Sequence, residues 1–133
     1  MNEKIDTFTE RELAYLADQR LGRLATIDRS GTPQNSPVGF RVADDGTVVI
    51  GGLHLGESRK FTNVEHHDRV SLVVDDIASF DPWRVRAVEI RGRAEARRDV
   101  EPDNDYMSRE QIVIHPERII SWGLDDAADS KAS

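Results

Sequence analysis

Residues 86–97 of the chain, RAVEIRGRAEAR, indicate the fold class most clearly. Small or apolar residues alternate with charged ones at every second position. The small or apolar set consists of Val88, Ile90, Gly92, Ala94 and Ala96. A period of two is that of a β-strand with one buried face and one wet face. The stretch therefore predicts a strand that lies on a hydrophobic core.

Further strands are predicted on both sides of this stretch, separated by short turns. The turns DRSGTP and ADDG are rich in Asp, Ser, Gly and Pro, which favour tight turns. Pro37 within one of the strands indicates an edge position or a bulge. Strands at such close spacing predict an antiparallel, mainly β barrel with six to seven strands. The predicted strands are 22–27, 34–43, 47–52, 69–74, 88–97 and 111–122, the last of them interrupted at Pro116.

Two short helices accompany the predicted barrel. TERE at 9–12 is a capping box that predicts a helix over 9–19. The segment 57–68 breaks the strand rhythm, and Ser58 at its start is a suitable helix cap. Residues 98–109 are charged and weakly patterned, which predicts a loop. We expect one split-barrel domain over 1–124 and a disordered tail over 125–133.

Composition excludes several classes of function. The 133 residues carry 25 acidic and 18 basic side chains, and a net charge of −7 disfavours binding to nucleic acid. Cysteine is absent, which removes disulfides and thiolate metal sites. We also predict no metal site at His66 and His67, because adjacent helical side chains point about 100° apart. No signal sequence or membrane-spanning run is evident, so we expect a cytoplasmic protein.

The segment GGLHLGESRKFTNV at 51–64 has the features of a phosphate site. A strand ends in Gly51 and Gly52, which allow a ring or phosphate close to the backbone, and a helix begins near Ser58. Helix N-termini present free N–H groups, while Arg59 and Lys60 add positive charge. The alternative interpretation is that Arg59 and Lys60 form only the solvated face of a helix.

Four stretches in order resemble one known family. They are LAYLADQRLGRLATIDRSGTPQNSPVGF, SRKFTNVEHHDRVSLVVDD, DPWRVRAVEIRGRAEA and IVIHPERIISWG, which together cover about residues 8–124. This order resembles the split-barrel flavin-binding proteins of the pyridoxamine 5'-phosphate oxidase superfamily. The compact length and the third stretch are most similar to its small branch that depends on the deazaflavin coenzyme F420.

The resemblance implies a split β-barrel homodimer with cofactor sites at the subunit interface. One wall of the ring site would be the second strand, at Ser36, Pro37, Val38 and Gly39. The phosphate would meet Ser58, Arg59 and Lys60. Trp83 and Trp122 would border the ring or substrate pocket, or they are core or interface tryptophans. The chain lacks the Arg-containing C-terminal segment of true pyridoxamine phosphate oxidases, so we expect no role in vitamin B6 synthesis.

The function implied is F420-dependent hydride transfer to an electron-poor small molecule. An FMN-binding reductase or oxidase, and a non-catalytic cofactor carrier, remain alternatives. Arg41, Arg84 and Arg86 are candidates to bind the longer anionic tail of F420. No side chain stands out as a catalytic proton donor, and the catalytic residues stay unknown.

Overall fold

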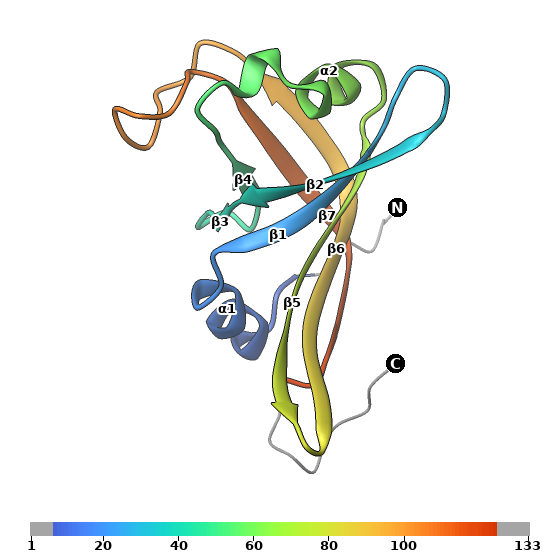
Figure 1. Ribbon diagram of the computed structural model, residues 1–133. Coiled ribbons are helices and arrows are strands. Elements are labelled where there is room, and N and C mark those ends of the chain that lie inside the picture. Colours follow the sequence, from blue (N-terminus) through green and yellow to red (C-terminus); the bar gives the residue numbers. More distant parts are fainter. Residues whose placement is uncertain (1–6, 125–133) are drawn as a thin grey trace, which may run out of the picture.

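The computed structural model describes residues 7–124 as a single curled sheet with two α-helices (Figure 1). The sheet has seven strands, and every neighbouring pair in it is antiparallel. The elements are α1 (Glu10–Ala17), β1 (Leu21–Ile27), β2 (Pro33–Gly39), β3 (Arg41–Val42), β4 (Val48–Ile50), η1 (Leu55–Glu57), α2 (Arg59–His66), β5 (Arg69–Phe80), β6 (Trp83–Arg97) and β7 (Gln111–Trp122). The predicted mainly β fold with two short helices is confirmed.

The strand order is β2-β1-β5-β6-β7-β4-β3, so β2 and β3 form the two edges of the sheet. The edge position of β2 explains how Pro37, which lacks an N–H, is accommodated there. The sheet curls into a half-barrel with α2 at one end (Figure 1). The hairpin of β5 and β6 extends toward the opposite end, and α1 lies beside it.

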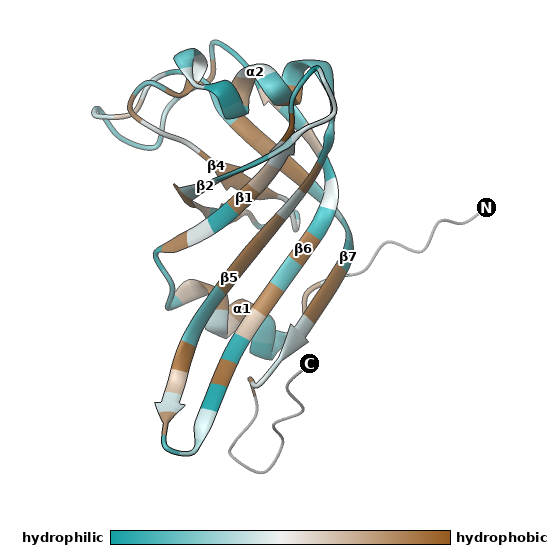
Figure 2. Cartoon of the chain, turned by 45° about the vertical axis from the view of Figure 1, so that its right-hand side comes forward, coloured by the Kyte–Doolittle hydropathy of each residue, from teal (hydrophilic) through white to brown (hydrophobic). Residues whose placement is uncertain are grey.

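The core lies on the inner face of the curled sheet. Hydropathy alternates along β6, as predicted for residues 86–97 (Figure 2). Val88 and Ile90 are fully buried, whereas Arg91 and Arg93 are exposed. Phe61 of α2 is also fully buried and closes the upper end of the core. Other fully buried core residues are Leu24, Ile50, Leu72, Ile112 and Ile114.

A bulge lies where β6 and β7 pair at Gly92 and Pro116. Arg91 pairs with Arg118, but Gly92 pairs with Pro116, so Glu117 is an extra residue in β7. The pairing of β7 with β4 ends at Ile114. The missing N–H of Pro116 therefore removes no hydrogen bond between β7 and β4, so proline is tolerated at this position. The expected interruption at Pro116 is therefore a bulge within one continuous strand.

The structure corrects two strand boundaries. The stretch 34–43 forms two strands, β2 and β3, separated at Phe40, and they lie on opposite edges of the sheet. The strand predicted over 69–74 continues to Phe80 and pairs with a β6 that begins at Trp83 rather than at residue 88. These added residues form an arm where side chains on both faces are accessible, so they show no strong alternation.

Helix α1 is fixed to the sheet by buried polar contacts. The predicted capping box is present, with the Glu12 amide donating to Thr9 Oγ1 at 3.1 Å and the Thr9 amide donating to Glu12 Oε1 at 2.9 Å. The hydroxyl of Ser121 in β7 donates to the other Glu12 oxygen at 2.6 Å. The loop predicted over 98–109 is confirmed, and the tail predicted over 125–133 lies outside the described residues.

Neither helix within residues 7–124 has the length and apolar character that a membrane span requires.

Candidate anion and cofactor site

The start of α2 is built by Ser58. Its hydroxyl accepts a hydrogen bond from the amide of Phe61 at 3.3 Å and donates to the carbonyl of Leu55 at 2.6 Å. Ser58 is therefore the predicted N-cap, and it places Arg59 and Lys60 in the first helical turn. Because its proton is already donated to Leu55, the Ser58 hydroxyl holds this turn in place and is not free to donate to a ligand.

A pocket of about 380 Å³ lies between this turn and the edge strand β2, and we call it the α2–β2 pocket. It brings together Ser36, Arg59 and Lys60, three residues that sequence analysis assigned to a cofactor site. Neither the Arg59 nor the Lys60 side chain forms a hydrogen bond or an ion pair with another residue in the range 7–124. The lining is Thr26, Gln34, Asn35, Ser36, Arg59 and Lys60.

The hydroxyl of Ser36 is the main sign that this pocket takes a ligand. Its oxygen is buried, yet it has no hydrogen-bond partner. A buried hydroxyl without a partner is costly, and such groups in native proteins are usually satisfied by a ligand, an ion or water. One unsatisfied hydroxyl and two uncompensated cations on the same pocket are the kinds of group that bind phosphate in proteins.

Asn63 fixes the geometry of this pocket, although sequence analysis did not identify it. Its side chain is buried, and its Nδ2 donates to Thr26 Oγ1 at 3.0 Å and to Gln34 Oε1 at 2.6 Å. One amide thus joins α2 to β1 and β2, the two strands that form the opposite wall. The sequence signal was an amide between the apolar positions Phe61 and Val64, and this signal is weak by itself.

Replacing Asn63 with alanine is expected to lower stability and to loosen the pocket. The change leaves Thr26 and Gln34 without their donor, which costs about 1–3 kcal/mol of unfolding free energy. Chemical denaturation of N63A beside T62A, an exposed position on the same helix, measures this cost. An N63A protein as stable as T62A would contradict the role assigned to the amide.

A second pocket, of about 230 Å³, lies at the other end of β2 and contains Gly39, Arg41 and Gly51. Ser36 and Gly39 are three residues apart in an extended strand, or about 10 Å. The two pockets lie about this far apart along β2, and the period of two puts positions 36 and 39 on opposite faces of the strand. The side chain of Val38 is buried in the core, so Val38 can offer a ligand only its backbone.

The two glycines after β4 have close neighbours from the chain itself. A Cβ on Gly51 would lie 3.1 Å from the sulfur of Met107, and one on Gly52 would lie 3.7 Å from Leu55. The carbonyl of Gly52 also accepts hydrogen bonds from the amide and hydroxyl of Ser108. The loop before β7 thus packs over these glycines. Their contact with a ring or phosphate stays a prediction.

Trp83 and Trp122 line neither pocket within one chain, and both lie far from α2. Trp83 begins β6 at the end of the arm, and Trp122 pairs with Ala87 near the same end. The 12 residues of β5 separate this end from α2, which at about 3.3 Å per residue is a distance of roughly 36 Å along the strand. Trp83 is 63% exposed and contacts Phe80 edge-to-face, with 6.0 Å between ring centroids.

Two of the three arginines suggested for an anionic tail are already paired. Arg41 binds Asp103 through two hydrogen bonds, at 2.7 and 3.2 Å. Arg86 binds Asp76, which also accepts a hydrogen bond from the Tyr15 hydroxyl at 2.9 Å. The hydrogen bonds from Arg86 hold the pKa of Asp76 below its usual value, and burial raises the pKa of Tyr15. This second cluster fixes α1 to the arm.

The chain is similar in sequence to proteins of one family. Residues 8–127 match the family described as pyridoxamine 5'-phosphate oxidase. A 5a,11a-dehydrotetracycline/5a,11a-dehydrooxytetracycline reductase of Streptomyces rimosus is 46% identical over 123 residues, which is 89% of this chain and 84% of the relative.

Solved structures with low sequence identity share the fold. A conserved hypothetical protein of Mycobacterium tuberculosis has a TM-score of 0.70 at 23% identity, covering 100% of this chain and 95% of that one. A putative pyridoxamine 5'-phosphate oxidase of Lactobacillus delbrueckii has a TM-score of 0.68 at 22% identity, covering 86% and 93%. An FAD-binding protein of Mesorhizobium loti has a TM-score of 0.63 at 20% identity, covering 87% and 94%.

The fold and the sequence match define a split-barrel oxidoreductase of the type that binds flavin-like cofactors. The chain belongs to the pyridoxamine 5'-phosphate oxidase family.

Proposed function

We propose that this protein is an F420-dependent reductase that transfers a hydride to an electron-poor carbon–carbon double bond. The observation that carries the proposal is the α2–β2 pocket, where the unpartnered Ser36 hydroxyl lies with Arg59 and Lys60. These groups fit the phosphate of a flavin or deazaflavin. The 46% identity to a dehydrotetracycline reductase supports a reductase acting on such a double bond.

The residues present would divide the work of binding along β2. Arg59 and Lys60 would neutralise the phosphate, and Ser36 would donate its free proton to a phosphate oxygen. The backbone of Pro37 to Gly39 would form the flat wall beside the ring. When bound, reduced F420 supplies the hydride, so the protein contributes binding, orientation and exclusion of water.

Flavin remains the second candidate cofactor. The FAD-binding protein of Mesorhizobium loti shares the fold, and the same anion pocket suits the phosphate of FMN. The two candidates differ beyond the phosphate, where F420 continues as an anionic tail and FMN ends.

Turnover tests the reductase directly. We expect reduced F420 to be reoxidised in the presence of a dehydrotetracycline, and the return of F420 absorbance measures this reaction. Reduced FMN is expected to give less turnover. If reduced F420 binds but no conjugated enone reoxidises it, the protein is a cofactor carrier and the proposed reductase activity is wrong.

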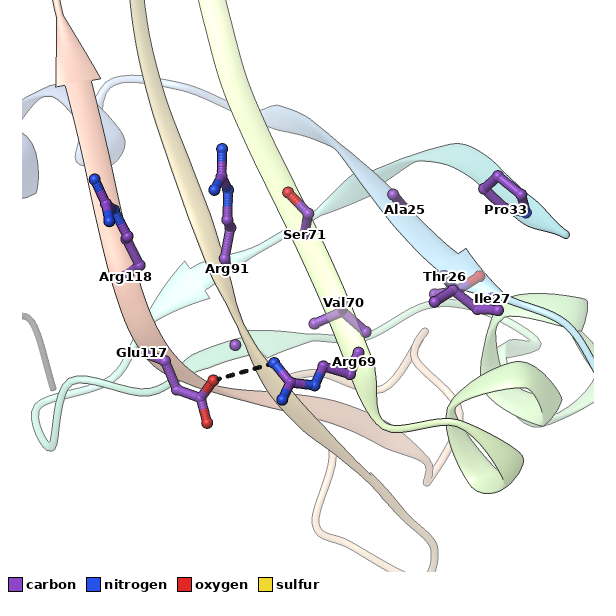
Figure 3. Close-up of a pocket in the computed structure, with 11 residues that line it drawn as sticks. Ala25, Thr26, Ile27, Pro33, Arg69, Val70, Ser71, Arg91, Glu117 and Arg118 are labelled. Atoms are coloured by element: carbon purple, nitrogen blue, oxygen red, sulfur yellow. Dashed lines mark ion pairs between the residues drawn. The ribbon is translucent and has the colours of Figure 1, made fainter. Parts of the chain in front are cut away.

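We further propose that the active form is a homodimer. The outer face of the sheet, opposite the core, is hollowed by a pocket of about 460 Å³ between β1, β5, β6 and β7 (Figure 3). Ala25 and Ile27 contribute apolar surface to it, and Arg69 forms an ion pair with Glu117 at 3.7 Å. The arm adds two exposed aromatic side chains, Phe80 and Trp83. A second copy of the chain would cover this face and bring its Trp83 toward a cofactor pocket.

The mass in solution checks the dimer. Light scattering is expected to give twice the chain mass of 15.0 kDa, and F80S/W83S is expected to shift the population toward monomer. Both side chains are exposed in the single chain, so the variant should keep its fold by circular dichroism. A monomeric mass for the wild type at high concentration would contradict the proposal.

A further inference from the structure

A third pocket, of about 420 Å³, adjoins the α2–β2 pocket. It is lined by residues 28–30, in the turn that joins β1 to β2, and by one side of α2. Figure 1 shows this turn next to α2. Arg59 lines both pockets and therefore forms the boundary between them. We call this space the turn pocket. A ligand whose phosphate lies beside Arg59 would have the turn pocket as its adjacent space.

The turn pocket contains another cation without a carboxylate partner. Arg29 forms no ion pair within residues 7–124, and its Nη2 instead contacts Nε2 of His66 at 2.9 Å. Arg29 thus differs from the arginines of the sheet that bind a carboxylate, such as Arg91, Arg93 and Arg97. Arg29, Arg59 and Lys60 thus gather around α2 with their charges uncompensated.

Two carboxylates line the turn pocket, and they differ in how they are bound. Asp28 is occupied by its own turn, since its Oδ1 accepts from the amide and hydroxyl of Ser30 and from the amide of Thr32. These hydrogen bonds hold the pKa of Asp28 below its usual value. The side chain of Glu57 is exposed and has no hydrogen bond or ion pair with another described residue. Glu57 is therefore the carboxylate that would oppose an incoming anion.

We propose that the turn pocket binds the anionic groups beyond the phosphate of the cofactor, with Arg29 as their principal contact, and so selects F420 over FMN. The inference rests on the proposed function. F420 carries its phosphate as a diester that continues into a carboxylate tail. FMN ends in a phosphate monoester and places nothing in the turn pocket. Selection therefore comes from Arg29, whereas Arg59 and Lys60 serve both cofactors.

The test is a set of fluorescence titrations of the purified protein with F420 and with FMN. R29Q is expected to weaken F420 at least about tenfold, the effect of losing one charge-assisted contact, and to leave FMN within about twofold. E57Q is expected to tighten F420 by about twofold to threefold, because a repelling charge is removed. R109Q, an exposed arginine in the loop before β7, controls for the loss of one positive charge. R84Q examines the remaining arginine that sequence analysis suggested for the tail.

A second measurement uses F420 whose tail has been shortened to the group next to the phosphate. The effect of R29Q should shrink with the shortened cofactor, since Arg29 then has less to bind. The role of the turn pocket is wrong if R29Q weakens the binding of F420 and FMN equally, or weakens the binding of neither. It is also wrong if only R84Q weakens F420 binding. In these cases the use of F420 still stands. If the wild type binds no F420 at all, the proposed function fails and this inference fails with it.

Discussion

Replacing Arg59 and Lys60 together with alanine is expected to weaken cofactor binding at least about a hundredfold. Each side chain would make a charge-assisted contact to phosphate, and such contacts contribute about 1.5–3 kcal/mol each. Their combined loss exceeds about 2.7 kcal/mol, which corresponds to a factor of about one hundred in Kd. Both F420 and FMN should be affected, because both present a phosphate to this pocket.

The same variant is expected to keep its stability. The side chains of Arg59 and Lys60 form no hydrogen bond or ion pair with another described residue, and the cap made by Ser58 remains. Thermal unfolding of the ligand-free protein should therefore change little, while the stabilisation by added cofactor should disappear. The fluorescence titration gives Kd, and R109A shows the effect of losing one positive charge outside the pocket. A double variant that binds cofactor within about fivefold of wild type would show that the phosphate lies elsewhere.

The second large effect is expected at Gly92. A Cβ at this position would lie 2.1 Å from the carbonyl oxygen of His115, which belongs to the backbone of β7 and cannot rotate away. G92A must therefore push β6 and β7 apart at the bulge, where the curvature of the half-barrel is set. We expect a loss of about 3 kcal/mol or more of unfolding free energy, or failure to fold.

Gly39 provides the matched control for this change. It also lies in a strand, but the nearest atom to an added Cβ is 3.9 Å away, an ordinary contact. G39A should alter the denaturation midpoint by only a few tenths of a molar unit of urea, corresponding to under about 1 kcal/mol. Equal stability of G92A and G39A would mean that the β6–β7 bulge can relax at little cost.

The sequence predicted the fold well where one face of a strand is buried. Val88 and Ile90 alternate with charged residues because the buried face of the strand requires apolar side chains. This alternation can therefore be recognised in a single sequence. The arm from Asp75 to Phe80 was missed because its two faces are both accessible, and no alternation is required there. The break at Phe40 was missed for a different reason. It depends on which edge of the sheet each short strand joins, and that is a property of the whole topology.

The sequence pattern predicted the cations of the site, and the family resemblance added Ser36. The helix cap and the adjacent cations, Ser58 to Lys60, lie together in sequence, and the structure places Arg59 and Lys60 beside Ser36. Asn63 and Arg29 were missed because their roles depend on side chains far away in sequence. Trp83 was assigned to the cofactor site by resemblance, yet within one chain it lies at the far end of the arm. The placement of Trp83 at the cofactor site stays a prediction that depends on the dimer.

Titration of the purified wild-type protein with F420 and, separately, with FMN tests the central claim most directly. Fluorescence quenching should show saturable binding of F420 with a Kd at least about tenfold below that of FMN, a difference of about 1.4 kcal/mol. Tighter binding of FMN would contradict the F420 assignment while leaving the anion pocket in place. Binding of neither would contradict the pocket of Ser36, Arg59 and Lys60 as a cofactor site.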